Sequence, residues 1–320
     1  MGATTTSAAE LAAFCVLRGP DDLSPETVLA HAPDDRLLLD HVARCSLWWR
    51  DVPAYRDERV GLLGHYVAVD AAAALQVLSL GCARLREAGC SLAIGPIDGS
   101  TWRRYRLLTQ RGDEPPFFLE PDNPDEWPAH WEGAGFRPIA DYYSAMLDDM
   151  TPPAELRAAQ LSAQGYSIRA IGPGRLGQTL DTIWTIAIDA FERNFLYAPV
   201  GRQEFVDGYK KLLPVVDSRL VLLAGHRGCP VGFCFAIPDV LAVRRGETGR
   251  TVIMKTLGIR RAHGGRGLGR LLFWRTVEAA AALGFRRAIL ALMHEANPSR
   301  RLGGPGARDF RRYTLYARPL

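Results

Sequence analysis

The residues with the clearest chemical potential form a basic, glycine-rich turn within Thr251–Leu272. Glycines let the backbone adopt positive φ and let a ligand approach without a Cβ in the way. The turn opens directly into a predicted helix, whose first amides lack internal partners and lie at the positive end of the helix dipole. The pattern therefore predicts a phosphate or pyrophosphate site. Its glycines and arginines are Gly264, Gly265, Gly267, Gly269, Arg260, Arg261, Arg266 and Arg270.

Three other interpretations of this turn compete with a phosphate or pyrophosphate site. The arginines could simply be solvated on a glycine-rich connection. The nucleotide-triphosphatase loop is absent, because no G-x-x-x-x-G-K-[ST] occurs. The dinucleotide fingerprint G-x-G-x-x-G also fails, since Arg270 stands where the third glycine should follow Gly265 and Gly267.

The elements that must position this turn are two strands and a helix. Thr251–Ile259 is predicted as a strand and Leu268–Leu283 as a helix that Gly284 ends. Arg287–Met293 follows as a short, apolar strand of the buried kind. The strand–turn–helix–strand order places the predicted anion site between the first strand and the N-terminus of the helix.

The segment resembles the GCN5-related N-acetyltransferases (GNAT), whose acyl-CoA signature is R/Q-x-x-G-x-G/A between a strand and a helix. Gly267-Leu268-Gly269 match its last three positions, and Ile259 stands where the strand-end Val does. Gly264 replaces the first Arg or Gln, so one contact to pyrophosphate is missing unless Arg266 or Arg270 supplies it.

The resemblance implies acetyl-CoA or another acyl-CoA as co-substrate, with pantetheine between the two strands. The run Ala291–Ser299 looks like the family's next strand followed by its Asn. The residues that the resemblance assigns to the acyl-CoA are Leu257, Gly258, Ile259, Gly264, Gly265, Arg266, Gly267, Leu268, Gly269, Arg270, Asn297 and Ser299.

The implied reaction is direct attack of an amine on the thioester, so the function expected is an N-acyltransferase with a small-molecule or peptide amine as acceptor. A base must deprotonate the amine, and an acid assists the leaving thiolate. We expect the base to be His294 or Glu295 and the acid to be Tyr313 or Tyr316, although each could instead cap or pack against a strand. The usual family ending is missing, and Arg308–Tyr316 stands in its place. A CoA- or ligand-binding sensor without catalysis is therefore the alternative.

The rest of the chain has a similar order of elements. Asp148–Gly165 is predicted as a linker, and Gly89 and Gly284 are each followed by Ala-Ile at the same distance, which indicates an internal repeat. We expect an α/β (α+β, GNAT-like) fold of two tandem GNAT-type domains, each a mixed twisted sheet flanked by helices. The expected domains are 1–150, a degenerate copy, and 160–320, the acyl-CoA-binding domain.

Further elements are predicted from periodicity and turn signals. The predicted strands are Arg36–Val42, Arg59–Val69, Ser91–Ile94, Tyr166–Ala170, Leu220–Gly225 and Val231–Pro238. The predicted helices are Ala71–Ala88, Leu176–Phe191 and Gln203–Leu213.

The N-terminal half is not expected to bind acyl-CoA. Its strand-to-helix junction has no glycine at the turn, and Asp70 stands where the helix begins. An N-cap carboxylate would satisfy the free amides and repel a phosphate. Gly95–Leu108, with Trp102, Tyr105 and Arg106, is instead either a contribution to a shared cleft or a turn followed by a packing segment.

Composition restricts the class of protein. The chain has 320 residues, 48% of them hydrophobic, and a net charge of +4, so nucleic acid is not an expected partner despite five arginines in Arg300–Arg312.

No membrane-spanning run and no signal peptide are recognised, and the six scattered cysteines indicate reduced thiols in a cytoplasmic protein. Histidine and cysteine spacing predicts no metal, and the preponderance of arginine over lysine suggests a bacterial source. Met1–Thr6 fits a myristoylation pattern, which a bacterial source argues against. The oligomeric state is left open.

Overall fold

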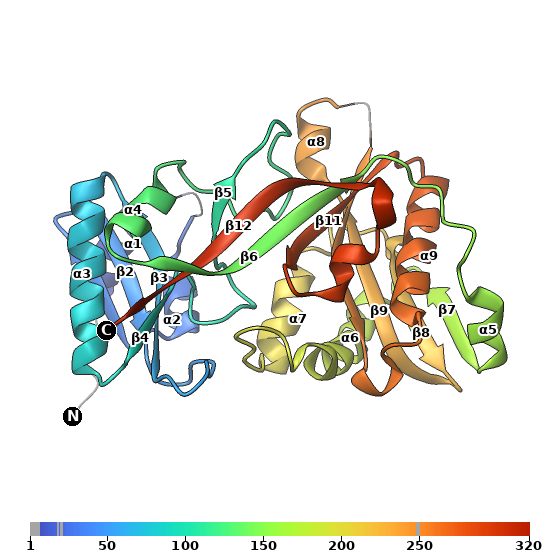
Figure 1. Cartoon of the computed structure of the whole chain (residues 1–320), viewed down its shortest axis with the longest axis horizontal. Coiled ribbons are helices and arrows are strands. Elements are labelled where there is room, and N and C mark those ends of the chain that lie inside the picture. Colours follow the sequence, from blue (N-terminus) through green and yellow to red (C-terminus); the bar gives the residue numbers. More distant parts are fainter. Residues whose placement is uncertain (1–6, 18, 20–21, 248–249) are drawn as a thin grey trace.

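The protein is described from a computed structural model, which covers residues 7–17, 19, 22–247 and 250–320. The Met1–Thr6 pattern lies outside the described residues. Twelve strands of the described chain form one mixed sheet in the order β1-β2-β3-β4-β12-β6-β11-β10-β9-β8-β7, with β5 pairing to β12. Figure 1 shows the two sequence halves at opposite ends of this sheet.

The N-terminal half contains an antiparallel trio of strands followed by a helical crossover to a parallel strand. In chain order these are β1 (Asp35–Leu39), β2 (Ala43–Trp48), β3 (Val60–Ala68), helix α3 (Ala71–Glu87) and β4 (Leu92–Gly95). Its other elements are α1 (Ala8–Val16), α2 (Pro25–His31), β5 (Leu107–Gln110), α4 (Trp127–Gly133) and β6 (Arg137–Leu147).

The C-terminal half repeats this order with one strand more. Its strands and crossover helix are β7 (Tyr166–Ala170), β8 (Val221–His226), β9 (Cys229–Pro238), β10 (Thr251–Ile259), α9 (Leu268–Ala282) and β11 (Arg287–His294). Strands β7 to β10 are antiparallel, and β10 and β11 are parallel. The remaining helices are α5 (Ala158–Ala163), α6 (Leu176–Phe191), α7 (Arg202–Lys210) and α8 (Val240–Arg244), and the last strand is β12 (Ala307–Pro319).

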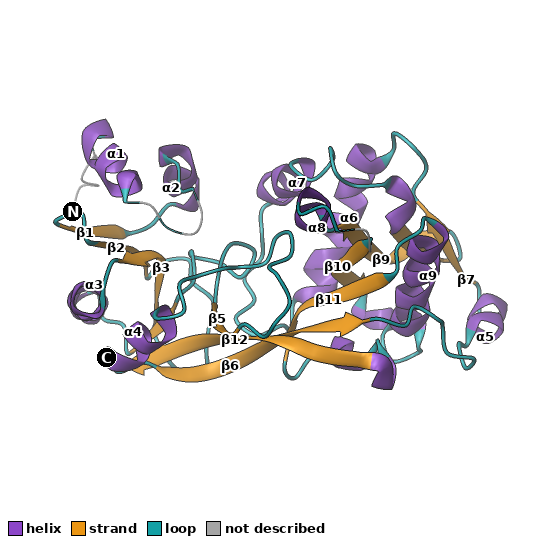
Figure 2. Ribbon diagram, turned by 90° about the horizontal axis from the view of Figure 1, so that it is seen from above, coloured by secondary structure: helices purple, strands orange, loops and turns teal. Residues whose placement is uncertain are grey.

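The two halves exchange their last strands. β6, the last strand of the N-terminal half, pairs with β11 of the C-terminal half. β12, the last strand of the chain, pairs with β4 of the N-terminal half, and β6 and β12 pair with each other along most of their length. Figures 1 and 2 show these two long strands crossing between the ends of the molecule. The exchange makes one continuous sheet from two repeated units.

Helices cover both faces of the C-terminal part of the sheet. Helix α9 contributes Leu272, Phe273 and Val277 to one core with Leu222 of β8, while α6 contributes Leu180 and Ile183 to the core on the opposite face. In the N-terminal half α3 packs its buried side against Leu47 and Leu63. Burial of these apolar faces is what turns amphipathic segments into packed helices.

Most predicted elements are confirmed to within two or three residues, with one exception. The expected strand Arg36–Val42 is wrong beyond Leu39, because Asp40 and His41 adopt left-handed φ values of 38° and 59° and turn the chain into β2, which was not predicted. Long strand β12 was not predicted either. The predicted linker contains α5, one short helix.

No helix in the described residues has both the length and the apolar composition needed to cross a membrane. All six cysteines are free, and only Cys229 is exposed.

Candidate active site

Strands β10 and β11 separate part of the way along their length. They pair from Thr251 with Arg287 to Met254 with Leu290, and beyond Met254 the remaining residues of β10 pair only with β9. The edge of β10 over Leu257–Ile259 is therefore open on the β11 side. The resemblance to the GNAT family implied a separation of these two strands, and the structure has one.

The glycine turn lies at the opening of this gap. Gly267 is the N-cap of α9 with φ 86° and ψ 0°, and no side chain caps the helix. A left-handed N-cap favours glycine because a Cβ there is strained. Gly265 also has positive φ, at 71°. Gly269 lies within α9 and does not have positive φ, so the conformational freedom expected of the glycines in this turn is not used at Gly269.

Three arginines near the turn are available for an anion. Arg266 and Arg270 are exposed, and no ion pair involves either of them in the described part of the chain. Arg157, which sequence reasoning missed, lies beside the turn: its Cδ would be 3.7 Å from a Cβ on Gly267. By contrast Arg261 is occupied, since it pairs with Asp189 at 3.5 Å and also with Glu192.

Asn297 and Ser299 lie just beyond the end of β11. The Asn297 side chain accepts a hydrogen bond of 2.9 Å from the Ser299 amide and so caps the short helical turn Pro298–Arg301. The Asn297 oxygen thus has a local structural partner.

His294 ends β11 and is half-buried. Its Nδ1 accepts a hydrogen bond of 3.1 Å from the Ala296 amide, so the neutral ring carries its proton on Nε2. That Nε2 is buried and has no hydrogen-bond partner. Burial lowers the pKa of His294, and nearby Arg106 lowers it further while Glu295 raises it. The ring is therefore neutral at physiological pH and offers a hydrogen-bond donor rather than a lone pair.

Glu295 is exposed, in contrast to its neighbour. Its Oε1 accepts a long hydrogen bond of 3.3 Å from the Asp141 amide, and the two residues are also joined through the backbone at 2.9 Å. A solvated carboxylate at the strand end can accept a proton from a nearby amine or water.

The sheet register brings His294 and Tyr313 together. His294 pairs with Tyr142 of β6, and Tyr142 pairs in turn with Tyr313 of β12, so the three side chains form one row across the sheet. The fully buried Tyr313 hydroxyl donates to Glu120 and lies 3.2 Å from Ser144 Oγ. Burial raises the pKa of Tyr313 well above its ordinary value.

Tyr316 is not part of this row. It is buried in the N-terminal core with Trp127 and Trp131, and its hydroxyl donates to Glu132 over 3.2 Å. Burial raises its pKa.

A cluster of aromatic side chains adjoins the row, and it includes residues of the N-terminal half. The Arg106 guanidinium lies 4.0 Å from the ring centre of Tyr105 and 4.2 Å from that of Tyr142. His294 packs edge-on against Tyr142, with ring centres 5.0 Å apart, and stacks on Phe195 at 5.3 Å. The sequence singled out Tyr105 and Arg106, but Tyr142 and Phe195 gave no signal beyond their aromatic type. Trp102, the third residue of that segment, donates to the carbonyl of Ala198 in the C-terminal half over 2.8 Å.

The equivalent gap in the N-terminal half is filled by the chain itself. β3 and β4 also separate after Leu62 and Ile94, but the Ile97 amide then donates to the Leu63 carbonyl over 2.8 Å. A Cβ on Gly64 would lie 2.2 Å from the Ile97 carbonyl oxygen, so this close approach requires glycine. Asp70 caps α3 as predicted, accepting from the Ala73 amide at 2.8 Å.

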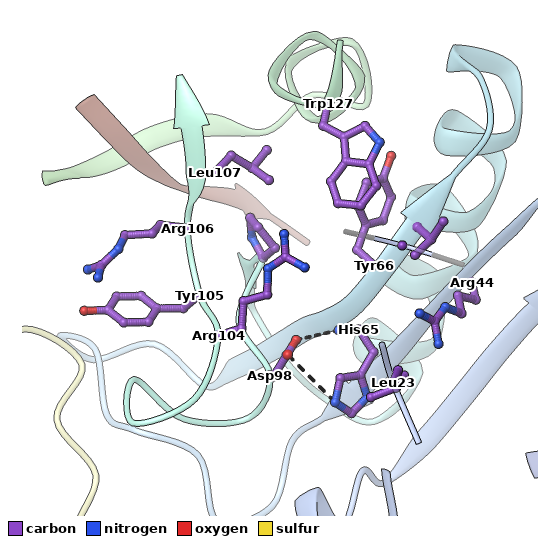
Figure 3. A pocket seen from close by; sticks show the side chains of 13 residues that line it. Leu23, Arg44, His65, Tyr66, Asp98, Arg104, Tyr105, Arg106, Leu107 and Trp127 are labelled. Carbon is purple, nitrogen blue, oxygen red and sulfur yellow. Dashed lines mark hydrogen bonds and ion pairs between the residues drawn. The ribbon is translucent and has the colours of Figure 1, made fainter. Parts of the chain in front are cut away.

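A pocket lies beside this filled gap and is shown in Figure 3. Arg104, His65 and Asp98 lie on one side of the segment that leads into β5, while Tyr105 and Arg106 point to the other side.

The donor atoms of His31, His65 and Asp98 lie within 4.8 Å of one another, the one group in the described residues that could hold a metal. The sequence missed it because His31 and His65 are 34 positions apart.

Four of the five C-terminal arginines pair with carboxylates, so they do not form an open phosphate-binding surface. The four pairs are Arg300 with Asp309, Arg308 with Glu114 and Asp148, Arg311 with Glu120, and Arg312 with Asp141.

The architecture is a mixed α/β fold in which helices flank one large mixed sheet, and solved GNAT acetyltransferases share this fold. Residues 181–302 match the acetyltransferase (GNAT) family. Among solved structures, the chain is similar to a GCN5-related N-acetyltransferase from Sphaerobacter thermophilus, at 17% identity and a TM-score of 0.50, over 97% of this chain and 91% of that one.

Two more relatives extend the comparison. The chain is 24% identical over 267 residues to a Caulobacter vibrioides protein named bacterial ceramide synthase, which covers 74% of this chain and 69% of that protein. It is also similar to the GCN5-related glucosamine N-acetyltransferase region of a fungal multi-domain GH3 β-N-acetylglucosaminidase. That similarity has 14% identity and a TM-score of 0.51, over 87% of this chain and 31% of the fungal one.

Proposed function

We propose that this protein is an acyl-CoA-dependent N-acyltransferase, with the acyl-CoA held by the C-terminal half. The observation that carries the proposal is the gap between β10 and β11 with the uncapped N-terminus of α9 at its opening. Free amides, the helix dipole and Arg266 and Arg270 suit the pyrophosphate, and the open edge of β10 suits the pantetheine amides. The name of the Caulobacter relative supports the same bond type, because a ceramide is an amide.

The proposed reaction is direct attack of an amine on the thioester carbonyl. The C–N bond forms, the C–S bond breaks, and the amine proton that is lost balances the proton that CoA thiolate gains. Glu295, solvated at the end of β11, is the proposed base, acting directly or through water. His294 is assigned a positioning role through its Nε2–H, because its Nδ1 is already bonded to Ala296.

The acid predicted from sequence receives less support. The hydroxyl protons of Tyr313 and Tyr316 are donated to Glu120 and Glu132. We therefore propose that the thiolate takes the proton that the attacking nitrogen loses, passed on by Glu295 or by water. Because both hydroxyls already donate to glutamates, neither supplies an acid for the leaving thiolate. This observation favours the alternative, a ligand-binding sensor without catalysis.

The N-terminal half, about residues 1–150, is proposed to be a degenerate copy that binds no acyl-CoA and shapes the acceptor side of the site. The proposal covers acetyl and longer acyl groups, and it does not specify the amine. A cytoplasmic setting is proposed from the free cysteines.

Incubation with acetyl-CoA, longer acyl-CoAs and an amine library, with detection of free thiol, tests the function. Glu295→Gln should lower kcat at least tenfold, and His294→Ala should lower kcat/KM, while Tyr316→Phe should leave turnover nearly unchanged. Acyl-CoA binding without thiol release under every amine would instead support the sensor. If all four single substitutions, including Tyr313→Phe, keep normal turnover, the assignment of the site is wrong.

A further inference from the structure

Arg106 is a buried cation without a counter-ion. It is 5% exposed, and its Nε and Nη1 have no hydrogen-bond partner. In the part of the chain that the structure describes, no carboxylate forms an ion pair with it. Burying an unpaired charge is costly, and such groups are ordinarily paired. An arginine in this state is suited to bind an anion.

Aromatic rings surround the guanidinium of Arg106. Its guanidinium lies against the faces of Tyr105 and Tyr142 and 5.9 Å from the ring centre of Tyr313. These cation–π contacts compensate part of the cost of burial but leave the N–H groups of Nε and Nη1 without an acceptor. The backbone of Arg106 has φ 67°, a left-handed conformation that a non-glycine residue adopts only where the surrounding structure holds it.

A second unpaired donor adjoins the same ring. His294 Nε2 is buried without a partner, and His294 packs on Tyr142 from the β11 side. Arg106 is also close enough to His294 to lower its pKa. Two buried donors without partners thus flank Tyr142, one from each half of the chain, at the end of the gap between β10 and β11.

We propose that Arg106 binds a carboxylate of a substrate, so that this enzyme acts on a carboxylate-bearing amine or transfers a carboxylate-bearing acyl group. Arginine matches a carboxylate because two parallel N–H groups can bond both oxygens. Placement at the end of the gap puts the carboxylate beside the reacting carbonyl, where either the acceptor or the acyl tail can carry it. The inference rests on the proposed function for the location of the reaction, but the anion site itself does not.

The experiment compares pairs of similar probes in which one member has a carboxylate and the other has a neutral group in its place. For the acyl source, dissociation constants are measured for succinyl-CoA and butyryl-CoA, which have four-carbon acyl groups. For the acceptor source, they are measured for phenylalanine and phenylalaninamide, with and without CoA. Each series uses the natural protein, Arg106→Gln, Arg106→Lys and the control Arg84→Gln, which removes a surface arginine of α3 that pairs only with Glu87.

A carboxylate preference of about 10- to 100-fold in one arm is expected, since charge-assisted bonds are the stronger kind. Arg106→Gln should abolish that preference, Arg106→Lys should weaken it, and Arg84→Gln should leave it unchanged. The affinity for acetyl-CoA should stay within about twofold in all variants. If Arg106→Gln does not fold, the Arg106→Lys comparison decides.

Equal affinities for charged and neutral probes in both arms would overturn the proposal, as would a preference that survives Arg106→Gln. A protein that binds no CoA derivative at all would instead contradict the proposed function. In that case the phenylalanine arm without CoA still tests Arg106, because it needs no acyl-CoA.

Discussion

The carboxylate of Asp98 accepts a hydrogen bond of 2.6 Å from the backbone amide of His65. This bond continues the pairing that β4 begins, and it occupies the edge of β3 that corresponds to the open edge of β10. The two halves have the same strand–helix–strand order, but only the C-terminal half keeps the gap. In the N-terminal half, the segment that contains Ile97 and Asp98 fills the corresponding gap.

Titration with acetyl-CoA is accordingly expected to give one site per chain. In the N-terminal half the chain fills the β3 edge, Asp70 occupies the Ala73 amide at the start of α3, and its carboxylate would repel a second pyrophosphate. Isothermal calorimetry measures the stoichiometry directly. Two equivalent sites per chain would contradict the assignment of the N-terminal half.

Gly267→Val should reduce CoA affinity at least tenfold while the protein remains folded. A Val with φ near 86° is strained by about 1–3 kcal/mol, and its side chain occupies the approach to the amides of α9. Gly177→Val is the matched control, because Gly177 lies in the first turn of α6 and a Cβ there meets nothing within 4 Å. Calorimetry that shows unchanged CoA affinity for Gly267→Val would remove the main support for the site.

Acid should destabilise the fold through the histidine pair of the N-terminal half. His31 Nδ1 and His65 Nε2 are 2.8 Å apart, and burial, with neighbouring arginines, lowers the pKa of each to about 3. The folded pKa lies below the unfolded value of about 6.5, so the unfolded chain binds more protons between these limits. Stability is therefore complete above about pH 6.5 and is lost as the pH falls toward 3.

The expected loss between pH 7 and pH 5 is about 2 kcal/mol for each histidine. Urea unfolding at a series of pH values measures it, and His31→Asn with His65→Asn should flatten the profile. The exposed His41 serves as control, since His41→Asn should not alter the pH dependence. If the natural protein is equally stable at pH 5 and pH 7, the histidine pair does not cause a loss of stability in acid.

Arg311→Leu should destabilise the protein by about 3–5 kcal/mol, because it leaves Glu120 buried without its counter-ion. The two side chains are 0% and 1% exposed and 2.9 Å apart. Arg275→Leu, which breaks an exposed pair with Glu278 on α9, should cost at most about 1 kcal/mol. Denaturant unfolding distinguishes the two, and similar losses for both variants would be the contrary result. Glu120→Leu combined with Arg311→Leu should recover part of the loss.

The sequence by itself determined the local features of the C-terminal half. The glycine turn, α9 and its flanking strands follow from residues within about 45 positions, where periodicity and caps act directly. The Asp70 cap and the repeated strand–helix–strand order are local in the same sense. His294 and Glu295 were predictable as a strand end, because Arg287–Met293 is a continuous apolar run.

Only the tertiary structure decided which of these residues meet. Tyr313 joins His294 through Tyr142 because β12 and β6 are exchanged between the halves, while Tyr316, three positions on, lies in the other core. Arg106 reaches the same row from the N-terminal half. These neighbours are about 20 to 210 positions apart in the chain, so their pairing depends on long-range strand register and on burial, and no local pattern of residue types encodes either.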